Sequence, residues 1–135
     1  MQRHTQKRGP AATILVVEDD SALRKSLKFS LQIEGFAVRL YASGRELLDD
    51  PDLPTHGCLI ADQRLQGMTG LELIAAFRDR DISLPAILVT TNPTIALRQL
   101  AADAGIPVIE KPFLGDALFD GVRNALARSV RPAGS

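Results

Sequence analysis

The stretch ILVVEDD, residues 14–20, places four large apolar residues directly before three carboxylates. Four consecutive apolar residues are typical of a strand that is buried on both faces of a parallel sheet. In such sheets, ligands bind outside the carboxyl ends of the strands. The stretch therefore predicts a buried strand that ends at a binding crevice, with Glu18, Asp19 and Asp20 at its end.

Four further apolar runs follow, and helical patterns separate them. The run at 37–41 carries Arg39 and fits an edge strand, and the other runs cover 58–61, 86–89 and 107–109. Apolar residues recur at helical spacing over 21–34, 44–50, 70–80, 94–104 and 114–128. This strict alternation predicts an α/β fold with a single doubly wound five-stranded parallel sheet. The expected strand order is 2-1-3-4-5, the flavodoxin-like class, with five helices on both faces.

Length and composition limit the remaining possibilities. The 135 residues suffice for one domain. We expect a disordered N-terminal arm over 1–12, a compact domain over 13–128 and a flexible C-terminal tail over 129–135. Lys and Arg number 16, as do Asp and Glu, which argues against a dedicated nucleic-acid binder. One cysteine and two histidines exclude an internal disulfide and a tetrahedral zinc site.

Two kinds of targeting segment are missing from the sequence pattern. No apolar run reaches the ~20 residues of a membrane helix. The basic N-terminus has no apolar segment behind it, as a signal peptide would. The sequence therefore predicts a cytoplasmic protein that does not associate with a membrane.

Polar residues follow the central apolar runs and meet at one edge of the predicted sheet. Glu18 and Asp19 follow the first run, Asp62 the third, Thr90 the fourth and Lys111 the fifth. Clustered carboxylates repel one another unless a cation compensates them, and Mg²⁺ prefers oxygen ligands together with phosphate oxygens. A hydroxyl and an ammonium group can both donate to phosphoryl oxygens, and an aspartate can be a phosphoryl nucleophile. The set predicts a Mg²⁺-dependent phosphoryl site.

Each of these residues also has an ordinary structural interpretation. Asp20 fits a helix N-cap, a role that we expect it to have in any case. Thr90 could be a plain strand end and Lys111 a surface lysine. Their joint occurrence at successive strand ends favours the phosphoryl site.

At this level of detail the chain resembles the receiver domain of bacterial two-component response regulators. The matching segments are 14–20, 58–65, 67–73, 87–90 and 110–113, in the order of the family. The resemblance implies that Asp62 is the phosphoacceptor for the phosphohistidine of a histidine kinase. It implies that Thr90 binds a phosphoryl oxygen and that Lys111 pairs with the carboxylate or the phosphoryl group. The Lys111-Pro112 peptide is often cis in this family.

The resemblance also implies a metal site. Asp19 would be a direct Mg²⁺ ligand, and Glu18 would act mainly through water. Asp62 and the backbone carbonyl of Arg64 would complete the protein ligands.

The sequence departs from the family pattern at three places. Val108 occupies the switch position three residues before Lys111, where the family usually has Tyr or Phe. Its branched side chain is stiff at χ1 and has no ring to swing. Thr91 is bulkier than the usual Ala or Gly, and residues 65–67 lack the usual proline. These departures concern signal output more than the chemistry at Asp62.

The sequence thus predicts a stand-alone receiver domain without a following DNA-binding or enzymatic domain, and a piece of a longer regulator stays open as the alternative. We expect a phosphorylation-controlled protein-binding switch, a phosphate shuttle or a phosphate sink. It would be no enzyme beyond its own phosphotransfer and dephosphorylation. Its partners would be a histidine kinase or phosphotransfer protein and a downstream protein target. A homodimer could form through charged residues of the last two helices, although a solvated helix surface is the better explanation for each of them: Arg98, Asp103, Asp116, Asp120 and Arg123.

Two other functions stay open. A phosphorylation-independent adaptor would keep the fold for protein contacts, which Val108 and Thr91 favour and the complete set of site residues opposes. A phosphatase of the best-known aspartate-dependent type would need an acid two residues after the nucleophile, where this chain has Arg64.

Overall fold

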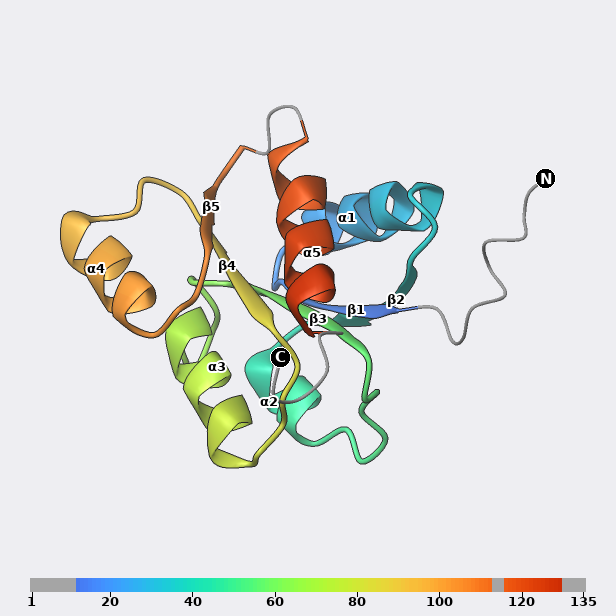
Figure 1. Ribbon diagram of the computed structural model, residues 1–135, viewed down its shortest axis with the longest axis horizontal. Helices are drawn as coiled ribbons and strands as arrows, with labels where there is room; N and C mark the ends of the chain where they lie inside the picture. Colours follow the sequence, from blue (N-terminus) through green and yellow to red (C-terminus); the bar gives the residue numbers. More distant parts are fainter. Residues whose placement is uncertain (1–11, 113–115, 130–135) are drawn as a thin grey trace.

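The computed structural model describes residues 12–112 and 116–129, and its strands and helices alternate along the chain (Figure 1). The strands are β1 (Thr13–Val17), β2 (Ala37–Tyr41), β3 (Gly57–Asp62), β4 (Ala86–Thr90) and β5 (Val108–Glu110). The helices are α1 (Ser21–Ile33), α2 (Gly44–Leu48), α3 (Gly70–Asp79), α4 (Ile95–Asp103) and α5 (Ala117–Ser129). No helix among the described residues is long and apolar enough to cross a membrane.

The strands form one parallel sheet in the order β2-β1-β3-β4-β5, which confirms the predicted topology. Val17 pairs with Ala61 of β3, and Asp62 pairs with Val89 of β4. Thr90 pairs with Glu110 of β5. This register brings the carboxyl ends of the central strands to the same edge of the sheet.

Two apolar clusters cover the two faces of the sheet, and Figure 1 shows the helices on either side. On one face, alternate strand residues pack against Leu27 and Leu31 of α1 and Val122 of α5. On the other face, residues of α2, α3 and α4 complete the core, among them the fully buried Phe77. The middle strands are therefore apolar until their last residues, because both of their faces are buried.

The helices begin at side chains that accept hydrogen bonds from the free amides of the first turn. Asp20 accepts from the amides of Ala22 and Leu23, which confirms its predicted capping role. Thr69 forms a reciprocal capping box with Glu72 at the start of α3. Thr94 caps α4 rather than belonging to it.

Three details differ from the sequence-based expectation or complete it. The fifth apolar run forms a strand that is only half-buried, because β5 is an edge of the sheet. The Lys111-Pro112 peptide is cis, as the resemblance implied. A Cβ on Gly121 of α5 would lie 2.9 Å from the Cδ1 atom of Ile109, so close packing against the sheet explains a glycine inside this helix.

Parts of three predicted segments lie outside the described residues. They are 1–11 of the N-terminal arm, 130–135 of the C-terminal tail, and 113–115, which hold the predicted start of the last helix.

Candidate functional site

Five residues of the predicted site lie at or just beyond the carboxyl ends of four strands. Glu18 and Asp19 follow β1 directly, and Lys111 follows β5. Asp62 and Thr90 are the last residues of β3 and β4, where the sequence had suggested positions just after the strands. The parallel register, rather than proximity in the sequence, brings these residues to one edge.

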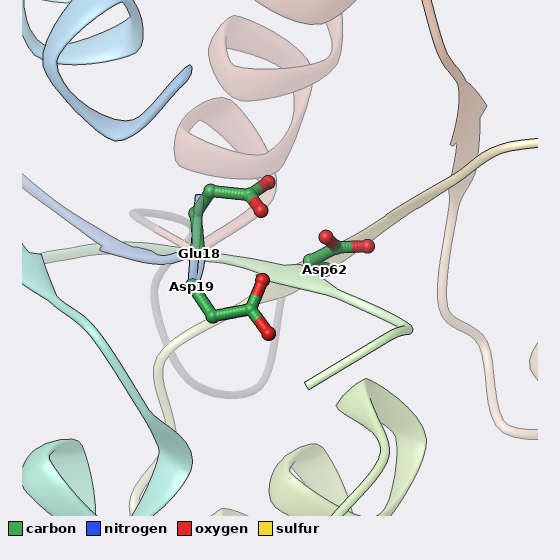
Figure 2. Close-up of side chains that lie close together, drawn as sticks. All are labelled: Glu18, Asp19 and Asp62. Atoms are coloured by element: carbon green, nitrogen blue, oxygen red, sulfur yellow. The ribbon is translucent and has the colours of Figure 1, made fainter. Parts of the chain in front are cut away.

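Three carboxylates gather at this edge. One oxygen each of Glu18, Asp19 and Asp62 lies within 4.8 Å of the others, and Figure 2 shows the side chains next to one another at the ends of β1 and β3. Glu18 and Asp62 are buried, with 2% and 4% of their surface exposed, whereas Asp19 is exposed. Asp19 has no ion pair or side-chain hydrogen bond to another described residue.

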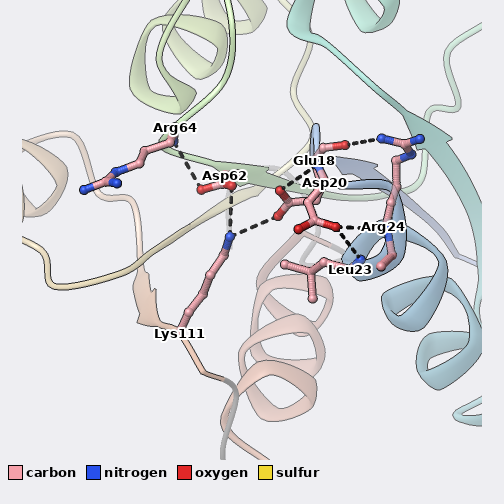
Figure 3. Close-up of polar contacts among 8 residues, drawn as sticks. Glu18, Asp20, Leu23, Arg24, Asp62, Arg64 and Lys111 are labelled. Carbon is pink, nitrogen blue, oxygen red and sulfur yellow. Dashed lines mark hydrogen bonds and ion pairs between the residues drawn. The ribbon is translucent and has the colours of Figure 1, made fainter.

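Lys111 links the two buried carboxylates. Its Nζ atom lies 2.9 Å from Oδ2 of Asp62 and 3.1 Å from Oε1 of Glu18 (Figure 3). Burial opposes the charge of this ammonium, but its bonds to Asp62 and Glu18 outweigh that effect and raise the pKa of Lys111. Burial raises the pKa of Glu18, and the neighbouring Asp62 acts in the same direction while Lys111 opposes them. One ammonium thus meets two of three acids, and negative charge remains at the site.

Backbone amides hold the Asp62 carboxylate and the end of β4 in place. The amide of Arg64 donates to Oδ1 of Asp62 over 3.2 Å, and the side chain of Arg64 extends away from the carboxylates (Figure 3). The amide of Lys111 donates to the carbonyl of Thr90 over 2.8 Å. The Thr90 side chain is buried at the end of β4, one residue after Val89, which pairs with Asp62 of β3, and no hydrogen bond joins its hydroxyl to the described residues.

Two of the three departures from the family pattern lie in β5 and directly after β4. Val108 is half-buried in β5, where it pairs with Leu88 and packs against the core. Thr91 is exposed, and it lines a cavity of about 370 Å³ together with Leu23, Lys111 and Pro112. The cavity leaves one side of Lys111 open.

Arg24 belongs to the site but was not singled out from the sequence. Its guanidinium donates to the backbone carbonyl of Glu18 over 2.7 Å (Figure 3). The sequence does not show which backbone carbonyl accepts a hydrogen bond from a side chain. The only sequence feature that could have indicated this role of Arg24 is its position one helical turn after the acids.

Charged residues on α4 and α5, which the sequence suggested for a dimer face, have partners within the chain. Arg98 pairs with Glu110 over 3.2 Å, and Gln99 donates to Asp103. Arg123 pairs with Glu34 of α1 and with Asp120.

Comparisons with known proteins agree with this fold. Residues 14–123 match the family described as the response regulator receiver domain. The chain is 34% identical over 122 residues to the transcriptional regulatory protein TdiR of Thauera aromatica, with 90% of this chain and 54% of that protein covered. It thus spans about half the length of that regulator.

Solved structures of FixJ are similar to the whole described domain. Full-length FixJ from B. japonicum matches with a TM-score of 0.80 and 33% identity, covering 90% of this chain and 60% of that one. The structure titled FixJ-N matches with a TM-score of 0.77 and 31% identity, covering 92% and 99% of the two chains.

Proposed function

This chain belongs to the receiver domains of response regulators, and we propose that Asp62 accepts a phosphoryl group from the phosphohistidine of a histidine kinase or phosphotransfer protein. The observation that carries the proposal is the contact of Lys111 with both Asp62 and Glu18, at 2.9 and 3.1 Å. The carboxylate of Asp19 lies beside them and has no ion-pair partner within residues 12–112 and 116–129. A buried aspartate held by a lysine at an open strand end suits a phosphoryl acceptor.

In the proposed transfer, an oxygen of Asp62 attacks phosphorus and forms a P–O bond. The P–N bond of the phosphohistidine breaks, and the imidazole nitrogen keeps its electron pair. Lys111 stays beside the new phosphoryl group and neutralises part of its charge, and the Thr90 hydroxyl donates to a phosphoryl oxygen. These residues position the reactants and stabilise charge, which is the main protein contribution to phosphoryl transfer.

Receiver domains bind Mg²⁺ at an acidic pocket, and the residues present here fit that ion. All three side chains offer carboxylate oxygens, the ligand type that Mg²⁺ prefers. Three carboxylates and one ammonium leave two negative charges for a dication to balance. Glu18, Asp19 and Asp62 would hold it, with the Arg64 carbonyl as a further ligand. When bound, Mg²⁺ would neutralise charge on the phosphoryl oxygens.

The test is intact-protein mass spectrometry after incubation with phosphoramidate, whose P–N bond resembles that of phosphohistidine. We expect a mass gain of one phosphoryl group that requires Mg²⁺. Asp62→Asn should abolish it, whereas Asp79→Asn, which removes an exposed carboxylate on α3, should leave it intact. A parent protein that gains no mass with Mg²⁺ would contradict the proposal.

We further propose that the phosphorylated domain acts as a protein-binding switch, as a phosphate shuttle or as a phosphate sink. Receiver domains are not classical enzymes, and the chemistry of Asp62 is confined to its own phosphorylation and dephosphorylation. The balance of 16 basic and 16 acidic residues supports protein partners rather than nucleic acid for this stretch of chain.

The phosphorylation-independent adaptor is the second candidate, and Val108 is the observation that favours it. Val108 is half-buried and packs against the core as an ordinary strand residue. It provides no ring that could change position with Thr90. Failure of the parent protein to gain phosphoryl mass would favour this function.

A further inference from the structure

The backbone carbonyl of Glu18 needs a hydrogen-bond donor that the sheet does not supply. β1 ends at Val17, so this carbonyl lies beyond the pairing of β1 with its neighbours. Glu18 is only 2% exposed, and a buried carbonyl without a partner is costly. The guanidinium of Arg24 meets it at 2.7 Å (Figure 3).

The start of α1 fixes the place from which Arg24 reaches back. Asp20 caps the helix through the amides of Ala22 and Leu23, and the amide of Arg24 donates to the Asp20 carbonyl over 2.9 Å. The side chain of Arg24 is half-buried rather than free in solvent. Its charge is permanent, and a charged donor makes a stronger hydrogen bond than a neutral one.

The carboxylates of the site depend on this backbone to different degrees. The side chain of Glu18 has its own restraints, because Lys111 donates to Oε1 and the amide of Asp20 donates to Oε2. Asp19 has no such restraint among the described residues, although its carboxylate belongs to the three-acid cluster. The orientation of the Asp19 carboxylate therefore depends mainly on the peptide between Glu18 and Asp19. Arg24 binds the carbonyl of that peptide.

We propose that Arg24 is a positioning residue for the metal-binding carboxylates, and that it acts by holding the Glu18–Asp19 peptide. This role rests on the proposed function, because it assumes that the three carboxylates bind Mg²⁺. The Arg24 guanidinium binds the backbone of Glu18 rather than a carboxylate of the site, so it would act on the metal only through that peptide. Its removal leaves the acids in place in the sequence but frees the peptide that orients Asp19.

The experiment measures Mg²⁺ affinity by isothermal titration calorimetry on the full chain. Removal of a group that orients a metal ligand typically weakens metal binding 10–100-fold, so we expect Arg24→Met to raise the Kd for Mg²⁺ about tenfold. Arg24→Lys keeps the charge but loses the planar fork, and it should fall between Arg24→Met and the parent.

Arg78→Met is the matched control. Arg78 also donates to a backbone carbonyl over 2.7 Å, that of Ala104 at the end of α4. Its loss should lower the melting temperature without changing the Kd for Mg²⁺. Lys25→Met removes an exposed positive charge from the same helix as Arg24 and should likewise leave the Kd unchanged.

The outcomes distinguish a positioning role of Arg24 from a purely structural role. A folded Arg24→Met protein with the affinity of the parent would show that Arg24 only supports the fold and would overturn the proposal. If Arg24→Met does not fold, the test uses Arg24→Lys instead. An unchanged Kd for Mg²⁺ in Arg24→Lys would then overturn the proposal. A parent protein that binds no Mg²⁺ would overturn the metal site and this role together. Phosphorylation of Asp62 is followed separately by mass, so its failure is distinguishable from failure of this role.

Discussion

Cys58 is fully buried near the start of β3, and burial raises the pKa of its thiol to about 12. The thiolate is the reactive form, so we expect no reaction of the folded protein with Ellman's reagent at pH 8 and full reaction in denaturant. Because the folded pKa lies above the ordinary value of about 8.5, ionisation of Cys58 does not make stability depend on pH below that value. It destabilises the fold as pH rises from about 8.5 toward the folded pKa. Stoichiometric labelling of the folded protein at pH 8 would contradict this description.

Most residues of the site could be predicted from their positions in the sequence, because one geometric rule brings them together. Parallel strands end at the same edge, so the residues that follow apolar runs meet there, as Glu18, Asp62 and Lys111 do. Contacts to the backbone could not be predicted in this way. Arg24 binds a carbonyl, and the sequence does not show which carbonyls lack a partner.

Helix α5 contains a glycine whose replacement tests how closely the helix packs on the sheet. A Cβ at Gly121 would lie 2.9 Å from Cδ1 of Ile109 and 3.5 Å from Cδ1 of Ile87. Ile109 is half-buried in an edge strand, so the end of its side chain can shift. Alanine gains about 1 kcal/mol over glycine inside a helix, and we expect Gly121→Ala to be stabilising by less than this amount. Urea unfolding measures it.

A larger side chain at position 121 should have the opposite effect on stability from alanine. Gly121→Leu would press on Ile87, which is fully buried, and should destabilise the protein by about 1–3 kcal/mol. Equal destabilisation by alanine and leucine would show that the contact with Ile109 cannot relax.

Strand β3 begins at a glycine that the sheet requires for a different reason. A Cβ at Gly57 would lie 1.9 Å from the backbone oxygen of Thr13, its partner in β1. A backbone atom cannot move aside as a side-chain end can, so Gly57→Ala must distort the pairing of β1 with β3. We expect a loss of about 3 kcal/mol in the free energy of unfolding. A loss similar to that of an exposed substitution such as Asp79→Asn would contradict this expectation.

The elements themselves could be predicted from the sequence, but their ends could only be approximated. Periodicity located all five strands and the helices, because burial of both sheet faces imposes it. It does not separate a capping residue from the helix that it caps. Thr94, Glu34 and Arg80 therefore counted as helical in the sequence but cap α4, α1 and α3 in the structure.

At the scale of the whole molecule, the site and the core are separate. The two apolar clusters lie on the faces of the sheet, whereas the carboxylates lie at one edge. Lys111 compensates only part of the negative charge at this edge of the folded protein, whereas in an unfolded chain the acids are solvated and Asp62 is far from Glu18 and Asp19. A ligand that balances them therefore binds the folded state in preference to the unfolded state.

This preference predicts that Mg²⁺ with beryllofluoride, a phosphoryl mimic, raises the stability of the whole domain. A ligand at a hundred times its Kd stabilises the folded state by about 2.7 kcal/mol. For a domain of this size that amount corresponds to a rise of roughly 10 °C in Tm. Differential scanning fluorimetry with and without a chelator measures the effect.

The controls separate specific binding from a general effect of salt. Asp62→Asn removes one of the three carboxylates and the proposed phosphoryl acceptor, so most of the rise in Tm should disappear. Asp79→Asn removes one exposed carboxylate elsewhere and should keep the full rise. Because unfolding of a single domain is cooperative, a ligand bound at the sheet edge must stabilise both apolar clusters together. Equal rises in the parent and in Asp62→Asn would mean that Mg²⁺ and beryllofluoride act elsewhere, and the acidic edge would not be their site.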